Sequence, residues 1–346
     1  MSNLQTKFNT FHKKIKVDID DQRELAEKRD IIVNKIISTL KKNEHLVPDM
    51  INKGSYIHGV GVEPVDPNEE YDIDIGLIFN IMSDDNSAKD VRTWVWDAIK
   101  DHSENVENKG PCIRVRYAAG YHVDIAIYAR YKSSEDIEDM QLGRKDNTWE
   151  ETNPEGLKTS IENHKKNFSG SVEDGANQFC RIVRYFKRWN DYYKPKKKDN
   201  KPFGLAFVLL VKKELSAPVL DSAGKSDDLE VLIRISQATA NTYGRISIQK
   251  PVKPWDDVFE RIDQSGMDDL KKRFSDLKSE LIKARDEEDE TKACNILKSI
   301  FGDDFPIPMK KSESLDNLSS EDRDLLKADL EAKEIPVTTS PWFKSE

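Results

Sequence analysis

The segment YDIDIGLIF, residues 71–79, constrains the fold of this chain more than any other. Its two acids, Asp72 and Asp74, alternate with Ile73 and Ile75. In a β-strand residues i and i+2 project from one face, so the acids share one face and the isoleucines share the other. An unpaired carboxylate is costly to bury in a strand that forms a core. The pattern therefore predicts a buried strand whose acids are compensated by a cation.

A third acid lies in the run PCIRVRYAAGYHVDIAIYA, residues 111–129, which predicts two strands joined near Gly120. Asp124 projects from the face opposite Val123 and Ile125. Three carboxylates from two strands are typical of a site for two Mg²⁺ ions, with Mn²⁺ as an alternative. Seen alone, Asp-x-Asp is more often the solvent face of an edge strand.

Just upstream, the sequence Lys53-Gly54-Ser55-Tyr56 supplies a candidate phosphate-binding turn. The glycine permits close approach of the backbone, and the serine hydroxyl with neighbouring N–H groups can hold terminal phosphates. We expect Gly54, Ser55 and Tyr56 to contact a nucleotide. A single Gly-Ser pair is almost no evidence for a phosphate-binding turn without the acids that follow it.

After about residue 150 several long segments show helical periodicity. In one of them, residues 178–190, an apolar stripe faces a basic stripe of Arg181, Arg184 and Arg188, with Lys187 beside it. The basic stripe has two interpretations, a binding surface for phosphates or the solvated face of an amphipathic helix. A second basic run, residues 194–198, is interrupted by proline and predicts an exposed loop.

Composition limits the class of protein. The chain has 346 residues, 37% hydrophobic and 34% charged, which predicts a solvated globular protein of two domains rather than a disordered one. No apolar run is long enough to span a bilayer, and a polar start predicts a cytoplasmic protein with no membrane partner. Three scattered cysteines predict buried thiols. The net charge of −9 disfavours a surface that grips nucleic acid broadly.

Together the Gly-Ser pair, the Asp-x-Asp strand and the third strand acid resemble the signature of polymerase-β nucleotidyltransferases over residues 53–128. The basic helix is similar to that of oligoadenylate synthetases, and most of residues 1–260 resembles the bacterial cGAS/DncV-like nucleotidyltransferases. This resemblance implies an α+β fold with a catalytic lobe at residues 1–155, a helical lobe at residues 156–346 and an active site in the cleft between them. It also implies that Lys187, helped by Arg184, contacts the donor triphosphate.

The resemblance further implies that the protein joins nucleoside triphosphates, ATP or GTP or both, into a cyclic di- or trinucleotide signal in anti-phage defence. In that reaction Asp72, Asp74 and Asp124 would be the catalytic acids and metal ligands. A transferase acting on a non-nucleotide, protein or RNA acceptor is the alternative enzyme, and an inactive nucleotide-binding scaffold is the third hypothesis. No zinc-ligand cluster precedes the basic helix. We therefore expect no DNA activator: the protein either makes product without added DNA or is switched by a small ligand or a regulatory protein partner.

Overall fold

The computed structural model describes most of the first 308 residues, namely residues 4–17, 19–66, 71–117, 120–132, 138–173 and 175–308. Within these ranges no helix combines the length and the apolar character that a membrane crossing requires. The chain combines a mixed sheet with flanking helices, so the predicted α+β fold class is confirmed.

The sheet has seven strands, and it is parallel only where β2 lies beside β5. Strands β1-β2-β5-β4-β3 form its main order, and β6 pairs with the far half of β5 and with β7. The bounds are β1 Asp49–Asn52, β2 Tyr71–Phe79, β3 Asn105–Asn108, β4 Ile113–Tyr117, β5 Tyr121–Lys132, β6 Glu138–Gly143 and β7 Trp149–Thr152. The two predicted acid-bearing segments are therefore neighbouring strands.

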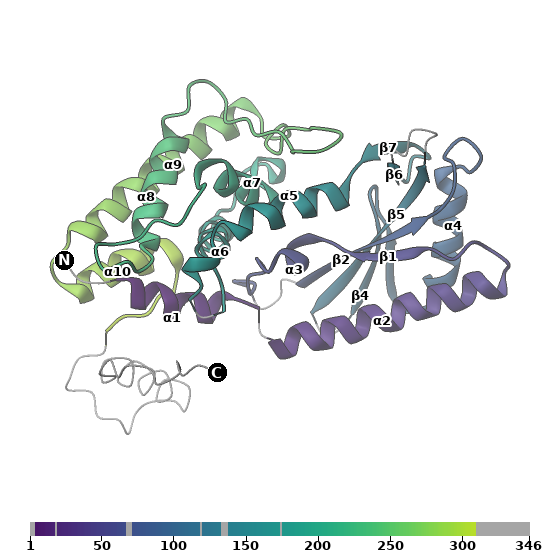
Figure 1. The fold of residues 1–346 in the computed structure, drawn as a ribbon, viewed down its shortest axis with the longest axis horizontal. Helices are drawn as coiled ribbons and strands as arrows, with labels where there is room; N and C mark the ends of the chain where they lie inside the picture. Colours follow the sequence, from purple (N-terminus) through teal and green to yellow (C-terminus); the bar gives the residue numbers. More distant parts are fainter. Residues whose placement is uncertain are drawn as a thin grey trace, which may run out of the picture. The chain divides into compact units, whose positions relative to one another are not determined.

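Two helices cover one face of this sheet, α2 (Ile19–Lys42) and α4 (Ala88–Ile99) (Figure 1). Their apolar side chains form one core with the alternate strand positions, including Ile73, Ile75 and Val123. Because side chains alternate along a strand, Asp72, Asp74 and Asp124 project from the opposite face, away from α2 and α4.

The remaining helices form a second core, which begins at the chain's N-terminal helix. They are α1 Gln5–Ile15, α5 Pro154–Lys166, α6 Gln178–Asp191, α7 Gly204–Glu214, α8 Asp228–Ala240, α9 Gln264–Asp286 and α10 Glu290–Phe301. The short helix α3 (Gly54–His58) and the 3₁₀ turns η1 (Ser169–Ser171) and η2 (Lys198–Asn200) connect these elements. The two N-terminal helices, α1 and α2, thus pack into different cores.

The Asn-Pro pair that precedes the helical half is the start of α5. The Asn153 side chain accepts a hydrogen bond from Gly156 N at 2.6 Å, and Pro154 occupies the first turn. Proline is favoured there because its missing N–H would have no partner inside the helix. The predicted domain boundary at residue 155 stays a prediction.

An aromatic cluster holds α1 to the last described segment of the chain. The rings of Phe8 and Phe11 on α1 lie 5.3 Å and 5.2 Å from the ring of Phe305, and 6.1 Å and 5.2 Å from that of Phe301. Tyr185 of α6 stacks on Phe11 at 5.4 Å. This cluster joins the two ends of the described chain through α6.

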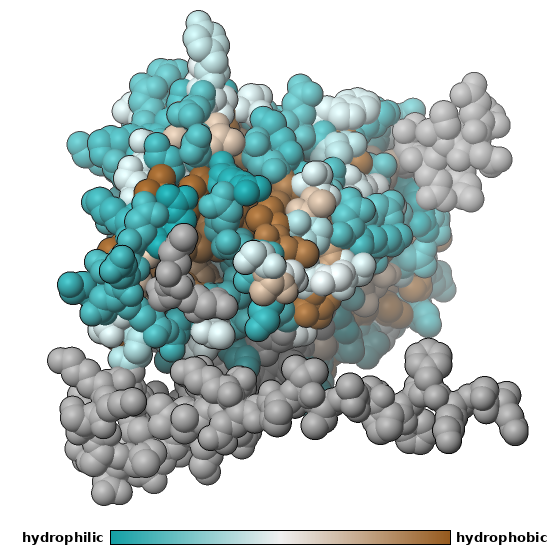
Figure 2. All heavy atoms as spheres, turned by 60° about the vertical axis from the view of Figure 1, so that its left-hand side comes forward, coloured by the Kyte–Doolittle hydropathy of each residue, from teal (hydrophilic) through white to brown (hydrophobic). Residues whose placement is uncertain are grey.

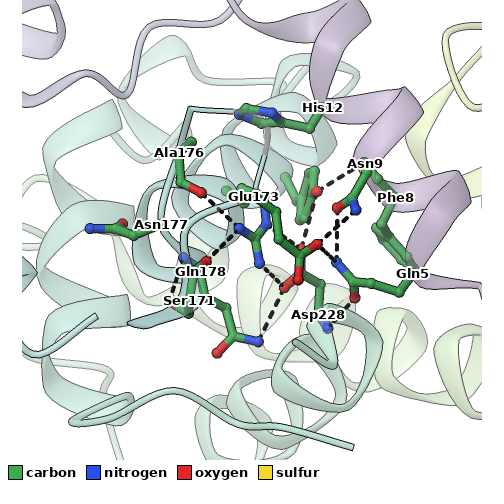
Figure 3. Close-up of polar contacts among 12 residues, drawn as sticks. Gln5, Phe8, Asn9, His12, Ser171, Glu173, Ala176, Asn177, Gln178 and Asp228 are labelled. Atoms are coloured by element: carbon green, nitrogen blue, oxygen red, sulfur yellow. Dashed lines mark hydrogen bonds and ion pairs between the residues drawn. The ribbon is translucent and has the colours of Figure 1, made fainter. Parts of the chain in front are cut away.

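A buried ion pair holds α6 to α8 from the same face of α6, one helical turn before Tyr185 (Figure 3). The Arg181 guanidinium donates to both carboxylate oxygens of Asp228 on α8, at 2.8 Å and 2.9 Å, and both side chains are fully buried. Its remaining donor reaches the carbonyls of Ser171 and Ala176. From α1, the Gln5 side chain accepts a hydrogen bond from Asp228 N. The charges are therefore satisfied within the protein.

The surface agrees with the composition. Figure 2 shows a face that is mostly hydrophilic, with hydrophobic side chains visible between polar ones. The lysines at 194, 196, 197 and 198 are exposed on the connection between α6 and α7, as predicted, and Lys197 pairs there with Asp263.

Candidate active site

The three predicted acids lie close together on two neighbouring strands. Asp74 of β2 is directly opposite Asp124 of β5, and Asp72 is opposite His122. Asp72 is exposed, whereas Asp74 and Asp124 are partly buried. The sheet thus brings all three acids to one patch of the face that is turned away from α2 and α4.

A cavity of about 460 Å³ opens beside Asp72 and Asp74. Its walls come from the sheet, from α3, and from the helical half through α5, α6, α7 and the segment at residues 250–253. Of the predicted nucleotide-binding residues, Gly54, Ser55 and Lys187 line it. The Tyr56 side chain lies outside the described part of the structure, so that prediction stays open.

Gly54 packs closely against the carboxylate of Asp74. Its φ is +70°, a left-handed conformation that favours glycine, and a Cβ at this position would overlap the Asp74 carboxylate. The adjacent Lys53 N–H donates to the Asp74 carbonyl at 2.8 Å. The absence of a side chain at residue 54 therefore lets α3 begin directly against the acidic strand.

The electrostatics of this corner favour a bound cation. Burial, followed by repulsion from Asp72, raises the pKa of Asp74 to about 7, with Lys53 acting in the opposite direction. Burial lowers the pKa of Lys53, but Tyr128 and Asp74 outweigh it, and the net shift is upward. The Lys53 ammonium lies 5.0 Å from the centre of the Tyr128 ring. Crowded carboxylates of this kind are hard oxygen ligands suited to Mg²⁺ or Mn²⁺.

Asp124 has a different partner. Both of its carboxylate oxygens accept hydrogen bonds from the Arg114 guanidinium of β4, each at 2.6 Å. Asp124 is not among the residues that line the cavity, and the described residues contain no group of three His, Cys, Asp or Glu side chains arranged to hold a metal. The sheet therefore places the third acid beside the site while its carboxylate faces Arg114.

Lys187 reaches the cavity from α6. Its ammonium donates to the Val60 carbonyl at 2.8 Å, and its side chain passes over Gly204, where an added Cβ would lie 3.2 Å from Lys187 Cε. Burial lowers the pKa of Lys187, while the charge of Asp72 opposes that shift. A buried cation on the wall opposite two carboxylates is well placed for a phosphate between them.

Arg184 is not brought into this cavity. Its guanidinium is buried, donates to the Gly61 carbonyl at 3.0 Å and lies 2.6 Å from His12 Nε2 of α1. Arg181 and Arg188 are buried as well. The basic stripe of α6 is thus not a solvated face, and the contact of Arg184 with a nucleotide stays a prediction. Its arginines tie α6 to neighbouring segments, and Lys187 alone of this group faces the site.

The polar side chains on the cavity wall that sequence reasoning missed include His58, Lys250 and Lys253. Burial, together with the charge of Lys165, lowers the pKa of His58 to about 4, so its imidazole is neutral near pH 7. Lys250 and Lys253 lie in the segment KPVKP, which has no helical or strand periodicity to orient it. Only their charge was a signal, and charge alone does not place a loop.

Comparison with known proteins agrees with this geometry. Residues 48–128, which span β1 to β5 and hold all three acids, match the family described as "Cyclic GMP-AMP synthase DncV-like, nucleotidyltransferase domain". The cyclic GMP-AMP synthase of Escherichia albertii is 31% identical over 145 residues, which are 40% of this chain and 30% of that protein. The sequence match thus spans less than a third of the relative's length.

Solved structures show the same fold over a larger part of the chain. The DncV cyclic AMP-GMP synthase of Vibrio cholerae superposes with a TM-score of 0.67 at 16% identity, covering 86% of this chain and 97% of that one. The same synthase in complex with the linear intermediate 5′ pppA(3′,5′)pG gives a TM-score of 0.67 at 14% identity, with 86% and 97% coverage. At such identities the likeness concerns the fold.

Proposed function

We propose that this chain, which resembles the DncV-like nucleotidyltransferases over residues 48–128, joins nucleoside triphosphates into a cyclic di- or trinucleotide and releases pyrophosphate. The observation that carries the proposal is the cavity in which Asp72 and Asp74 face Lys187. Paired acids with an opposed cation and a glycine turn suit a triphosphate whose charge must be held on two sides.

Divalent cations, two Mg²⁺ ions or Mn²⁺ in their place, are part of this proposal. Asp72 and Asp74 would hold them, with Asp124 as the third ligand. When bound, such ions neutralise the triphosphate and promote ionisation of the acceptor hydroxyl. The burial and the nearby charge of Asp72 that raise the pKa of Asp74, and the space left by Gly54, all support the fit of these residues to a cation.

The protein's own residues have separate tasks in the reaction. Ser55 and Lys187 hold the terminal phosphates, so that the bond between the α-phosphorus and the leaving pyrophosphate is the one that breaks. The ribose hydroxyl of a second nucleotide forms the new bond to that phosphorus, and its proton is lost. Ring closure repeats the step within the linear product. No covalent enzyme intermediate is needed, which agrees with a site built from carboxylates and lysines.

ATP and GTP are the proposed substrates, by analogy with the cyclic AMP-GMP synthase that shares this fold. The test is to incubate the purified chain with all four triphosphates and Mg²⁺, and to identify products by mass spectrometry. We expect a cyclic product that disappears in Asp74→Asn. A nucleotide attached to a protein or RNA acceptor would favour the alternative transferase. Release of no pyrophosphate under any condition would favour the inactive scaffold.

The proposed role of the product is signalling in anti-phage defence, inside the cytoplasm. Cells that express the chain should resist phage infection better than cells that express Asp74→Asn. Equal sensitivity of the two strains would remove this role without affecting the proposed reaction.

A further inference from the structure

Four charged residues form one row across the sheet, at right angles to the strands. Asp74 of β2 is opposite Asp124 of β5, Asp124 is opposite Arg114 of β4, and Arg114 is opposite Glu107 of β3. Residues that are opposite each other on adjacent strands project from the same face and lie within side-chain reach. Arg114 is therefore placed between two carboxylates, with the proposed catalytic acids on one side and Glu107 on the other.

In this structure the Arg114 guanidinium binds Asp124 rather than Glu107. It binds Asp124 with a two-pronged contact, Nε to Oδ1 and Nη2 to Oδ2, each 2.6 Å long. Charge-assisted contacts of this geometry are among the stronger hydrogen bonds of proteins. The exposed fractions of the two side chains, 20% and 13%, leave little water to weaken the contact. Asp124 is thus held in a fixed orientation while Asp72 and Asp74 face the cavity.

Resting on the function proposed above, we infer that Arg114 is a positioning residue that withholds Asp124 from metal binding until the rest of the site is filled. Asp72 and Asp74 can accept a cation without any change at Arg114. Asp124 can join them only when Arg114 gives up at least one of its two hydrogen bonds. The acid that completes the site is therefore the last to become available.

The row also provides a second partner for the displaced guanidinium. Glu107 lies on the far side of Arg114, accepts a hydrogen bond from Arg116 at 2.6 Å and pairs through its other carboxylate oxygen with Lys109 at 3.4 Å. Its side chain is 43% exposed, so a second arginine can approach it from solvent. Arg114 can thus exchange its contact with Asp124 for one with Glu107. After this exchange its guanidinium still has a carboxylate partner.

The experiment measures binding of Mn²⁺ alone to the full chain, by electron paramagnetic resonance of the free ion, without nucleotide. Arg114→Gln should lower the Kd by about tenfold or more, because Mn²⁺ no longer competes with the guanidinium for Asp124. The same substitution in an Asp124→Asn background should leave the Kd of that background unchanged. Arg130→Gln is the matched control, since Arg130 also has a side chain 20% exposed and binds an aspartate, Asp49, at 2.6 Å. It should bind Mn²⁺ like the wild type.

Two results would overturn the inference. One is an Arg114→Gln protein whose Kd for Mn²⁺ stays within about twofold of the wild-type value. The other is a gain that persists in the Asp124→Asn background, because the substitution would then act through net charge rather than through this carboxylate. If circular dichroism shows that Arg114→Gln is unfolded, Arg114→Lys takes its place with the same criteria and a smaller expected gain.

The outcome is separable from that of the proposed function. A wild-type chain that makes cyclic product while Mn²⁺ binding ignores Arg114 would refute this inference alone. Mn²⁺ binding that follows the expected pattern in a chain without any nucleotidyltransferase product would refute the proposed function alone.

Discussion

Gly54 and Asp74 are so close that a single methyl group on the glycine would occupy the position of the carboxylate. The contact joins the first residue of α3 to the acid-bearing strand β2. The backbone of the proposed phosphate-binding turn therefore packs directly against the proposed metal ligand, with no room for a side chain between them.

Gly54→Ala should reduce product formation by roughly 10²-fold, since it displaces the Asp74 carboxylate by the order of 1 Å. The matched control is Gly59→Ala. Gly59 has a similar φ of +60° but no atom within 4 Å of an added Cβ. Both variants should lose about 1–2 kcal/mol of stability through the left-handed backbone. Thermal unfolding measures the loss of stability that both variants share, and turnover measures the loss of activity that is expected only for Gly54→Ala. Equal activity of the two variants would show that the contact is unimportant.

Lys187→Met should weaken binding of the triphosphate by about 1.5–3 kcal/mol, because the substitution removes the ammonium but keeps the aliphatic stem over Gly204. The Michaelis constant and turnover with ATP and GTP report the effect. Lys197→Met serves as the control, since Lys197 is exposed on the loop after α6. If the two variants behave alike, Lys187 has no role in phosphate binding.

Asp228→Ala should destabilise the fold by about 3–5 kcal/mol, since it leaves the Arg181 guanidinium buried without a counter-charge. Urea unfolding measures the change. Asp276→Ala removes an aspartate from an exposed pair with Lys272, whose side chains are 62% and 72% accessible, and should leave the midpoint unchanged within error. A small effect at Asp228 would mean that the cluster in Figure 3 relaxes around the loss.

His58 should make stability depend on pH. Its pKa falls from 6.5 to about 4 on folding, so the unfolded chain takes up a proton before the folded one as the pH decreases. The stability that His58 contributes is therefore complete above about pH 7 and is lost as the pH falls toward about 4. His58→Gln lacks this dependence. The difference in unfolding free energy between wild type and variant should shrink on acidification, and a constant difference would contradict the prediction.

Duplex DNA should not stimulate the enzyme. The net charge of −9 and the burial of Arg181, Arg184 and Arg188 leave α6 without a broad exposed basic surface of the kind that DNA binding requires. Product formation with and without DNA, across a salt series, is the measurement. Stimulation that disappears at high salt would indicate a basic surface that we have not recognised.

Features that follow from a pattern of neighbouring residues could be predicted from the sequence, whereas features that depend on contacts between distant residues could not. The alternation in YDIDIG is a local pattern, and it predicted both the strand and the shared face of Asp72 and Asp74. Helical periodicity likewise predicted α6. It could not reveal that the face with Arg184 packs on His12 and Gly61, because these partners lie more than 120 residues away along the chain. The pairing of Arg114 with Asp124 depends on strand register, which follows from the whole sheet.

The aromatic cluster around Phe8 and Phe11 has a consequence for how the protein is made. Phe8 and Phe11 are synthesised almost three hundred residues before their partners Phe301 and Phe305. Until then α1 lacks part of its hydrophobic surroundings, whereas α2 can already pack on the sheet. Domains form as units during synthesis, and contacts between distant residues form slowly. Helix α1 is thus fully enclosed only after Phe301 and Phe305 have been synthesised, and a chain that lacks them exposes part of the apolar face of α1.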